Sequence, residues 1–225
     1  MLSIAHPPRL PLIAPSILSA DFGRMVEDCR QVIGAGADLL HVDVMDGHFA
    51  PNLTMGPDMC RGIRRAMPDV YLDVHLMVTD PVKYLDAFAA AGANMFTFHV
   101  EAVKDHEVES LVAKIRSKGM NVGLAINPPT DVERIIPHLG LIDMALVMSV
   151  NPGFSGQKFI QETLAKTSKI RAILRSDQRL QMDGGVSPDN AESVRRAGCD
   201  VIVGGSAIFG KSSENRASVI NQMRG

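Results

Sequence analysis

The chain has 225 residues, a formal net charge of −2, 46% hydrophobic residues and 21% charged residues. This length can bury one sizeable core and the composition gives no sign of a second, so residues 1–225 are predicted to form a single domain. The near-neutral charge excludes a strong global field that would recruit nucleic acid or an anionic membrane, so we expect neither as a partner.

The cysteines and the first residues indicate the compartment. Cys29, Cys60 and Cys199 are scattered and form no C-x-x-C pair, which argues against a disulfide framework or a structural zinc knuckle. Prolines interrupt residues 1–11, where a signal peptide needs an apolar run, and no later stretch is long and apolar enough to span a bilayer. We therefore expect a soluble, cytoplasmic protein with free thiols.

From Leu12 onward, short apolar runs alternate with longer amphipathic segments eight times, which predicts repeated strand–helix units. The predicted strands are residues 12–18, 39–47, 71–77, 95–100, 122–126, 142–150, 180–183 and 201–203. The predicted helices are residues 22–34, 57–67, 81–91, 105–118, 131–136 and 160–175, with a last one at the carboxyl end. Eight units favour an α/β protein with a closed (β/α)₈ barrel. An open doubly wound sheet with a nucleotide site is the alternative, but no G-x-G-x-x-G follows the first strand and no P-loop motif occurs.

The strand at residues 39–47 carries polar side chains inside an apolar run. His41, Asp43 and Met45 share one face because strand side chains alternate. The strand at residues 71–77 repeats this pattern with Asp73 and His75. A buried carboxylate normally finds a metal, a partner or a proton. The alternative is a carboxylate satisfied by hydrogen bonds in the core.

Active sites of such barrels lie at the carboxyl ends of the strands, where four of these polar residues can converge. They are His41, Asp43, His75 and Asp183. Two histidines and two carboxylates suit Zn²⁺, Fe²⁺ or Mn²⁺. Each residue alone is explained equally well as a hydrogen-bonded core residue, but the four together favour a metal site.

The remaining histidines offer a weaker alternative. His99 and Glu101 would share a face at the end of the fourth strand and form a rival ligand pair. Asp73 and Glu101 are better explained as carboxylates that orient the ligands. The other four histidines are predicted to be solvent-exposed: His6, His48, His106 and His138.

Glycine-rich turns follow the sixth, seventh and eighth strands, at residues 151–156, 184–185 and 204–205. Backbone N–H groups in adjacent barrel loops form a phosphate cradle without any lysine, although glycine serves tight turning equally well. A phosphorylated small molecule is therefore expected. Met45, Met77 and Met148 end strands on the inward face. They either pack in the core or form an apolar surface that keeps water away from a reacting carbon.

Together these residues resemble the ribulose-phosphate 3-epimerase family over nearly the whole chain. The resemblance rests on residues 14–22, 41–52, 73–78, 151–157, 183–185 and 204–207. It implies a metal-dependent isomerase of the pentose phosphate pathway. This enzyme would interconvert D-ribulose 5-phosphate and D-xylulose 5-phosphate by two-base proton transfer at C3 through an enediolate.

The resemblance also implies roles for residues and partners. One divalent ion, with Zn²⁺ expected first and Fe²⁺, Mn²⁺ or Co²⁺ as alternatives, would be held by His41, Asp43, His75 and Asp183. Asp43 and Asp183 would be the acid/base pair, and the substrate would be a phosphorylated ketopentose. Relatives of this kind imply a homo-oligomer, a dimer or a hexamer. The substrate-binding residues would be Ser16, Met45, His75, Met77, Met148, Gly153, Phe154, Ser155, Gly156, Asp183, Gly184, Gly185, Gly205 and Ser206.

The chain departs from the family pattern in the loop after the sixth strand and just before Asp183. Ser155 stands where the family usually carries glycine, and Gln181-Met182 stand where a glutamate and an aliphatic residue are commoner. Two alternative functions remain: an epimerase of a phosphorylated hexulose of the allulose 6-phosphate type, and a non-catalytic sugar-phosphate-binding protein. A barrel decarboxylase or aldolase is disfavoured because the second strand lacks a D-x-K-x-x-D arrangement.

Overall fold

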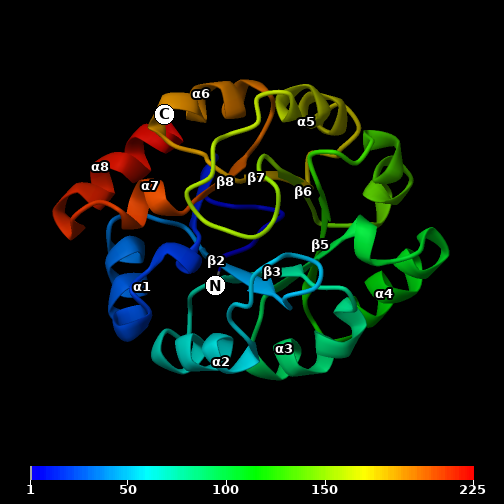
Figure 1. Ribbon diagram of the computed structural model, residues 1–225, viewed down its shortest axis with the longest axis horizontal. Coiled ribbons are helices and arrows are strands. Elements are labelled where there is room, and N and C mark those ends of the chain that lie inside the picture. Colours follow the sequence, from blue (N-terminus) through cyan, green and yellow to red (C-terminus); the bar gives the residue numbers. More distant parts are fainter. Residues whose placement is uncertain (1) are drawn as a thin grey trace.

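A ring of eight parallel strands forms the centre of the computed structural model, which describes residues 2–225 (Figure 1). The strand order is β1-β8-β7-β6-β5-β4-β3-β2, and an isolated parallel bridge between Ser16 and His41 joins β1 to β2. The predicted (β/α)₈ barrel class is therefore confirmed. The strands are β1 (Leu12–Pro15), β2 (Leu40–Met45), β3 (Leu72–Met77), β4 (Met95–His99), β5 (Asn121–Ile126), β6 (Met144–Met148), β7 (Arg179–Asp183) and β8 (Val201–Gly204).

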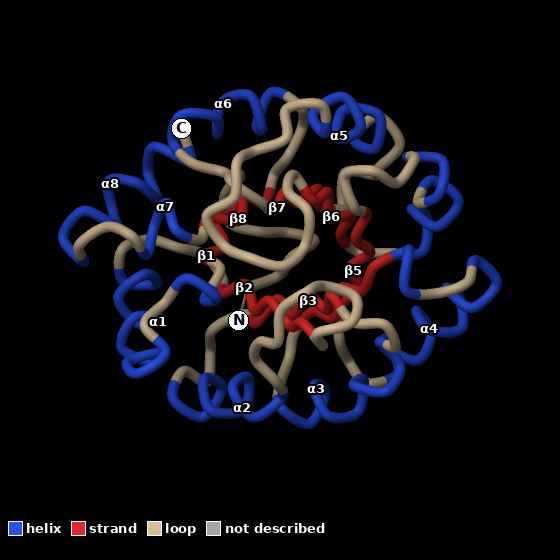
Figure 2. The backbone as a smooth tube through the Cα atoms, in the orientation of Figure 1, coloured by secondary structure: helices blue, strands red, loops and turns tan. Residues whose placement is uncertain are grey.

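Helices surround the ring on its outer side (Figure 2). They are α1 (Met25–Gly34), α2 (Pro57–Ala66), α3 (Leu85–Ala91), α4 (Asp105–Ser117), α5 (Thr163–Arg171), α6 (Pro188–Arg196), α7 (Ser206–Phe209) and α8 (Ser213–Arg224). Among the described residues, none of the helices combines the length and apolar character needed to cross a bilayer.

Several predicted bounds were wrong. The helix predicted at residues 131–136 is replaced by two 3₁₀ helices, Val132–Arg134 and Ile136–Leu141. Pro137 lacks the N–H that an α-helix would use there, which favours the tighter turns. The first strand ends at Pro15 rather than at residue 18, because the 3₁₀ helix Ile17–Ser19 follows it. The helix predicted at residues 160–175 is shortened to Thr163–Arg171.

The alternation of side chains divides the core into two parts. On β2, Leu40, Val42 and Val44 face outward and join the cluster between the sheet and the helices. Inward-facing residues at the amino ends of the strands, such as Leu12 and Tyr71, form a separate plug. Polar side chains on the inward face of β2 are thereby left above this plug, toward the carboxyl ends.

At the amino ends of the strands, a polar side chain just before each even-numbered strand accepts a hydrogen bond from the start of the preceding odd-numbered strand. These N-terminal clamps join Asp38 to Ile13, Asn94 to Leu72, Asp143 to Val122 and Asp200 to Leu180, at 2.7–2.8 Å. Each clamp residue also contacts an arginine: Arg224, Arg64, Arg116 and Arg179 respectively. This end of the barrel is built for pairing strands.

Candidate active site

Four potential metal ligands converge at the carboxyl half of the barrel: His41 and Asp43 from β2, His75 from β3 and Asp183 from β7. One ligand atom from each lies within 4.8 Å of all the others. His75 Nδ1 lies 3.3 Å from His41 Nε2, 3.0 Å from Asp43 Oδ1 and 3.7 Å from Asp183 Oδ2. Ligands about 2.0–2.1 Å from a tetrahedral ion are spaced by about 3.3 Å. The four side chains therefore fit one shared ion.

Further groups behind the cluster orient its imidazoles. His41 Nδ1 lies 2.8 Å from Asp73 Oδ2, which also accepts a 2.7 Å hydrogen bond from Gln181 Nε2. Because Nδ1 of His41 faces a carboxylate, its Nε2 is left to face the other ligands. His75 contacts His99. The alternative ligand pair, His99 and Glu101, therefore lies behind His75 and outside the four-residue group.

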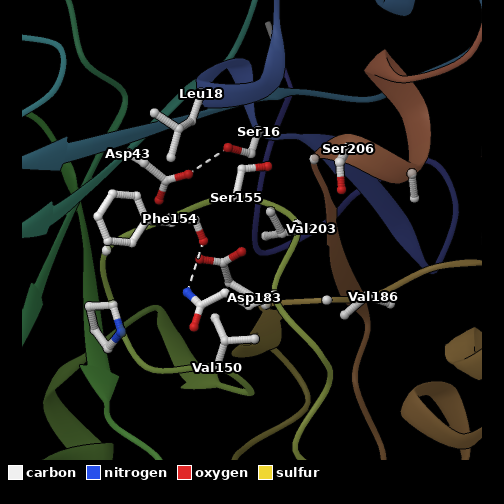
Figure 3. Close-up of a pocket in the computed structure, with 18 of the residues that line it drawn as sticks. Ser16, Leu18, Asp43, Val150, Phe154, Ser155, Asp183, Val186, Val203 and Ser206 are labelled. Atoms are coloured by element: carbon white, nitrogen blue, oxygen red, sulfur yellow. Dashed lines mark hydrogen bonds between the residues drawn. The ribbon is translucent and has the colours of Figure 1, made fainter. Parts of the chain in front are cut away.

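The two carboxyl groups of the cluster, Asp43 and Asp183, differ in pKa. Burial alone would raise the pKa of Asp43, but the positive charge of His41 and the hydrogen bond from His41 hold this pKa well below its usual range. Burial raises the pKa of Asp183 to about 7, and the negative charge of Asp43 adds to this effect. Ser16 Oγ donates a hydrogen bond to Asp43 (Figure 3). The site thus places an ionised carboxylate and a protonatable one beside the same space.

That space is a pocket of about 330 Å³ at the carboxyl ends of the strands. His75 is fully buried behind Asp43 and, within the described chain, does not line the pocket. All the other predicted substrate-binding residues do: Ser16, Met45, Met77, Met148, Gly153, Phe154, Ser155, Gly156, Asp183, Gly184, Gly185, Gly205 and Ser206.

Backbone N–H groups of the glycine-rich turns line one wall of the pocket. Among residues 2–225, none accepts a hydrogen bond from the backbone N–H of Gly184, Gly185, Gly205 or Ser206. Gly184 and Gly185 have φ of 121° and 63°, and a Cβ on either would come within 2.7 Å of neighbouring backbone. Close packing therefore requires glycine here, and the free N–H groups suit an anion.

The β6–α5 loop, residues 149–162, lies over one side of the barrel mouth and is yellow-green in Figure 1. Asn52 Nδ2, in the loop after β2, donates a 2.8 Å hydrogen bond to the carbonyl of Gly153. Ser19 Oγ and Ser155 Oγ lie 2.6 Å apart. Ser155 therefore joins this loop to the segment after β1.

One exposure prediction was wrong. His138 is 8% exposed, because the 3₁₀ helix Ile136–Leu141 packs it against the barrel, with Nε2 4.0 Å from Asp105 Oδ1. His6, His48 and His106 are exposed as predicted.

Sequence reasoning also missed part of the pocket wall. It expected an anion cradle without lysine, whereas Lys211, just after α7, lines the same pocket. The sequence signal was its place six residues after Gly205. Other lining residues that were not predicted are Leu18, Val150, Pro152, Gln157, Val186, Ser187, Val203, Ala207 and Gly210.

Comparison with known proteins gives a consistent result. The model of the ribulose-phosphate 3 epimerase family matches residues 12–209. The ribulose-phosphate 3-epimerase of Serratia marcescens is 45% identical over 203 residues, covering 89% of this chain and 96% of that protein. The enzyme of the same name from Escherichia coli K12 is 44% identical over 216 residues, covering 95% of this chain and 94% of that one. The solved structure of 3-hexulose-6-phosphate synthase from Salmonella typhimurium matches with a TM-score of 0.72 and 16% identity, covering 95% of this chain and 96% of that chain, a likeness of fold alone.

Proposed function

The chain belongs to the ribulose-phosphate 3-epimerase family, and from this premise we propose that its pocket inverts C3 of D-ribulose 5-phosphate to give D-xylulose 5-phosphate. This reaction is a step of the pentose phosphate pathway. One observation supports the proposal above the rest: two aspartates from β2 and β7, Asp43 and Asp183, line one pocket and belong to the same group of four potential metal ligands.

Inverting a carbon beside a ketone needs a base that removes its proton and an acid that returns one on the other face. Asp43, ionised, takes the C3 proton. Asp183 delivers a proton to the opposite face, and the roles exchange in the reverse direction. His41, Asp43, His75 and Asp183 would hold the divalent ion, which when bound stabilises the negative charge developing on the enediolate oxygens.

The rest of the pocket binds the sugar phosphate and excludes water. Met45, Met77 and Met148 are almost fully buried and line the pocket as an apolar wall, which limits exchange of the transferred proton with solvent. The free N–H groups of the glycine turns receive the phosphate. Ser16, hydrogen-bonded to Asp43, would contact a sugar hydroxyl.

Zn²⁺ is the ion we propose, because it suits two nitrogen and two oxygen donors, and these four lie within 4.8 Å of one another. Metal analysis of the purified protein distinguishes it from Fe²⁺, Mn²⁺ and Co²⁺. A homo-oligomer, a cytoplasmic location and a single domain over residues 1–225 stay predictions. Equilibrium sedimentation measures the first of them.

The decisive experiment compares turnover of ribulose 5-phosphate and allulose 6-phosphate by the wild type, Asp43→Asn and Asp183→Asn. We expect the pentulose to be preferred and each variant to lose a factor of about 10²–10⁴ or more in kcat/KM, because each removes an acid/base group. Asp58→Asn is the control, since that side chain is 93% exposed on α2. Wild-type turnover by either site variant would remove that aspartate from the acid/base role. A strong preference for the hexulose phosphate would overturn the substrate assignment.

Removal of the ion tests the remaining part of the proposal. Exhaustive chelation is expected to stop epimerisation, and adding Zn²⁺, Fe²⁺ or Mn²⁺ to restore it. Full activity in protein verified to be metal-free would contradict a metal-dependent mechanism.

A further inference from the structure

Behind the metal ligand His75 lies a buried chain of hydrogen-bonding groups that the mechanism above does not use. His75 Nε2 lies 2.8 Å from His99 Nε2 on β4, and His99 Nδ1 lies 3.2 Å from Glu101 Oε2. Both imidazoles are fully buried. The other oxygen of Glu101 accepts a 2.9 Å hydrogen bond from the backbone N–H of Asn127, just after β5. These contacts therefore link His75 on β3 to β4 and to the end of β5.

The end of this chain at Glu101 is rigidly held. Lys166 Nζ, on α5, donates hydrogen bonds to the carbonyls of Asn127 at 2.8 Å and Pro128 at 3.0 Å, and also to that of Thr130. These bonds fix the loop whose backbone holds the carboxylate. Hydrogen bonding to His99, Asn127 and Thr130 outweighs burial and lowers the pKa of Glu101 to about 2. Glu101 is therefore an ionised acceptor.

Because Glu101 is an acceptor, it determines which ring nitrogen carries the proton in His99 and in His75. Glu101 requires a proton on Nδ1 of His99, so Nε2 of His99 carries a lone pair. That lone pair accepts the proton on Nε2 of His75. His75 is then left with its lone pair on Nδ1, the atom that lies 3.0 Å from Asp43 Oδ1 among the ligand atoms.

We propose that His99 and Glu101 are positioning residues that set the tautomer and ring orientation of His75, so that its Nδ1 is ready to bind the divalent ion. The inference rests on the proposed metal centre. It differs from the arrangement at His41, where a carboxylate, Asp73, contacts the ligand imidazole directly. At His75 an imidazole stands between ligand and carboxylate.

The test measures Zn²⁺ affinity by competition with a chromophoric chelator, together with the visible absorption spectrum of the Co²⁺-loaded protein. His99→Leu removes the acceptor, and we expect Zn²⁺ binding about 10–100-fold weaker and a changed Co²⁺ spectrum. His99→Gln offers a carbonyl to His75 and an amide N–H to Glu101, so it is expected to stay within about 3-fold of the wild type. Glu101→Gln no longer dictates one proton arrangement and should weaken binding about 10-fold.

A buried histidine that is not part of the hydrogen-bonded series from His75 to Glu101 supplies the matched control. His138→Leu also replaces a buried imidazole, and it is expected to leave Zn²⁺ affinity and the Co²⁺ spectrum unchanged. If His99→Leu does not fold, the contrast between His99→Gln and Glu101→Gln carries the test. Equal weakening in His138→Leu and His99→Leu would overturn the inference, because the loss would then follow from any buried cavity.

The outcomes also separate this inference from the proposed function. Wild-type affinity and spectrum in His99→Leu and Glu101→Gln, with binding lost in His75→Ala, would overturn the positioning role and leave the metal centre in place. Unchanged Zn²⁺ binding in His75→Ala would instead overturn the metal centre itself.

Discussion

At the residue scale, the support of the ligand His41 depends on a contact across the barrel. Asp73 contacts His41 and accepts a hydrogen bond from Gln181, and all three side chains are fully buried. Gln181 Oε1 contacts no hydrogen-bond partner in the described chain, whereas its Nε2 is used. The amide thus supplies a donor to Asp73 without bringing a second negative charge.

Replacing this amide with a carboxylate tests the arrangement. In Gln181→Glu two carboxylates about 2.7 Å apart must share a proton, so the apparent pKa of the pair rises above that in the unfolded chain. The folded state then binds the extra proton, and stability relative to the wild type falls as pH rises. Urea unfolding of metal-free protein should show a larger deficit at pH 7 than at pH 5, because the deficit grows with pH from the ordinary glutamate pKa of about 4.3 upward. A deficit independent of pH would contradict the shared proton.

The four potential metal ligands were predictable because each is polar on an otherwise buried strand and lies near its carboxyl end. Their supports were harder to predict. Gln181 and Asp73 are 108 positions apart, and their contact depends on how the barrel closes. Asp73 and Glu101 were expected to orient ligands, but the insertion of His99 between Glu101 and a ligand depends on the register of β3 and β4.

At the element scale, the β6–α5 loop is held over the pocket by few contacts. Asn52 bonds to Gly153 and Ser19 to Ser155, while Phe154 at the tip is 58% exposed. Few buried contacts make such a segment easy to open. Each of these hydrogen bonds therefore increases the fraction of time for which the loop covers the pocket.

Removing either bond should loosen the loop. In Ser155→Gly and in Asn52→Ala we expect KM to rise about 2–10-fold with little change in kcat, because a bond worth about 1 kcal/mol is lost from the closed form. Faster limited proteolysis within residues 149–162 should accompany this rise. Ser155→Thr keeps the hydroxyl and serves as the control. Unchanged KM and unchanged proteolysis in both variants would show that the loop is held by other contacts.

The order and type of the strands were well predicted from alternation and periodicity, whereas the helix α6 between β7 and β8 was not predicted. The bounds were not well predicted either, because local hydrogen bonding decides them. The segment from residue 131 became 3₁₀ helices around Pro137, and this change buried His138, which the sequence pattern placed at the surface.

At the scale of the whole molecule, the two ends of the barrel have separate tasks. The carboxyl ends carry the pocket, and the N-terminal clamps tie the strands in pairs at the opposite end. Changes at the clamps should therefore affect stability and spare chemistry.

Asp143→Ala tests this separation. The variant leaves the N–H of Val122 without its 2.7 Å acceptor and removes one of the two 3.0 Å contacts of Arg116, so we expect the free energy of unfolding to fall by about 1–3 kcal/mol. The kcat and KM below the unfolding transition should match the wild type. Asp69→Ala, an exposed change before β3, is the control and should cost no more than about 0.5 kcal/mol. A large loss of kcat in Asp143→Ala would show that the two ends are coupled.

The junction of β1 and β2 gives the barrel a seam. Other neighbouring strands share a ladder, whereas these two meet at the bridge between Ser16 and His41. An ion shared by His41, Asp43 and Asp183 would link β2 to β7 across this junction and would stabilise the closed barrel. Occupancy of the site would then slow amide hydrogen exchange along β1 and β2 more than along β4 and β5, so that the catalytic centre also fastens the cylinder in which it sits.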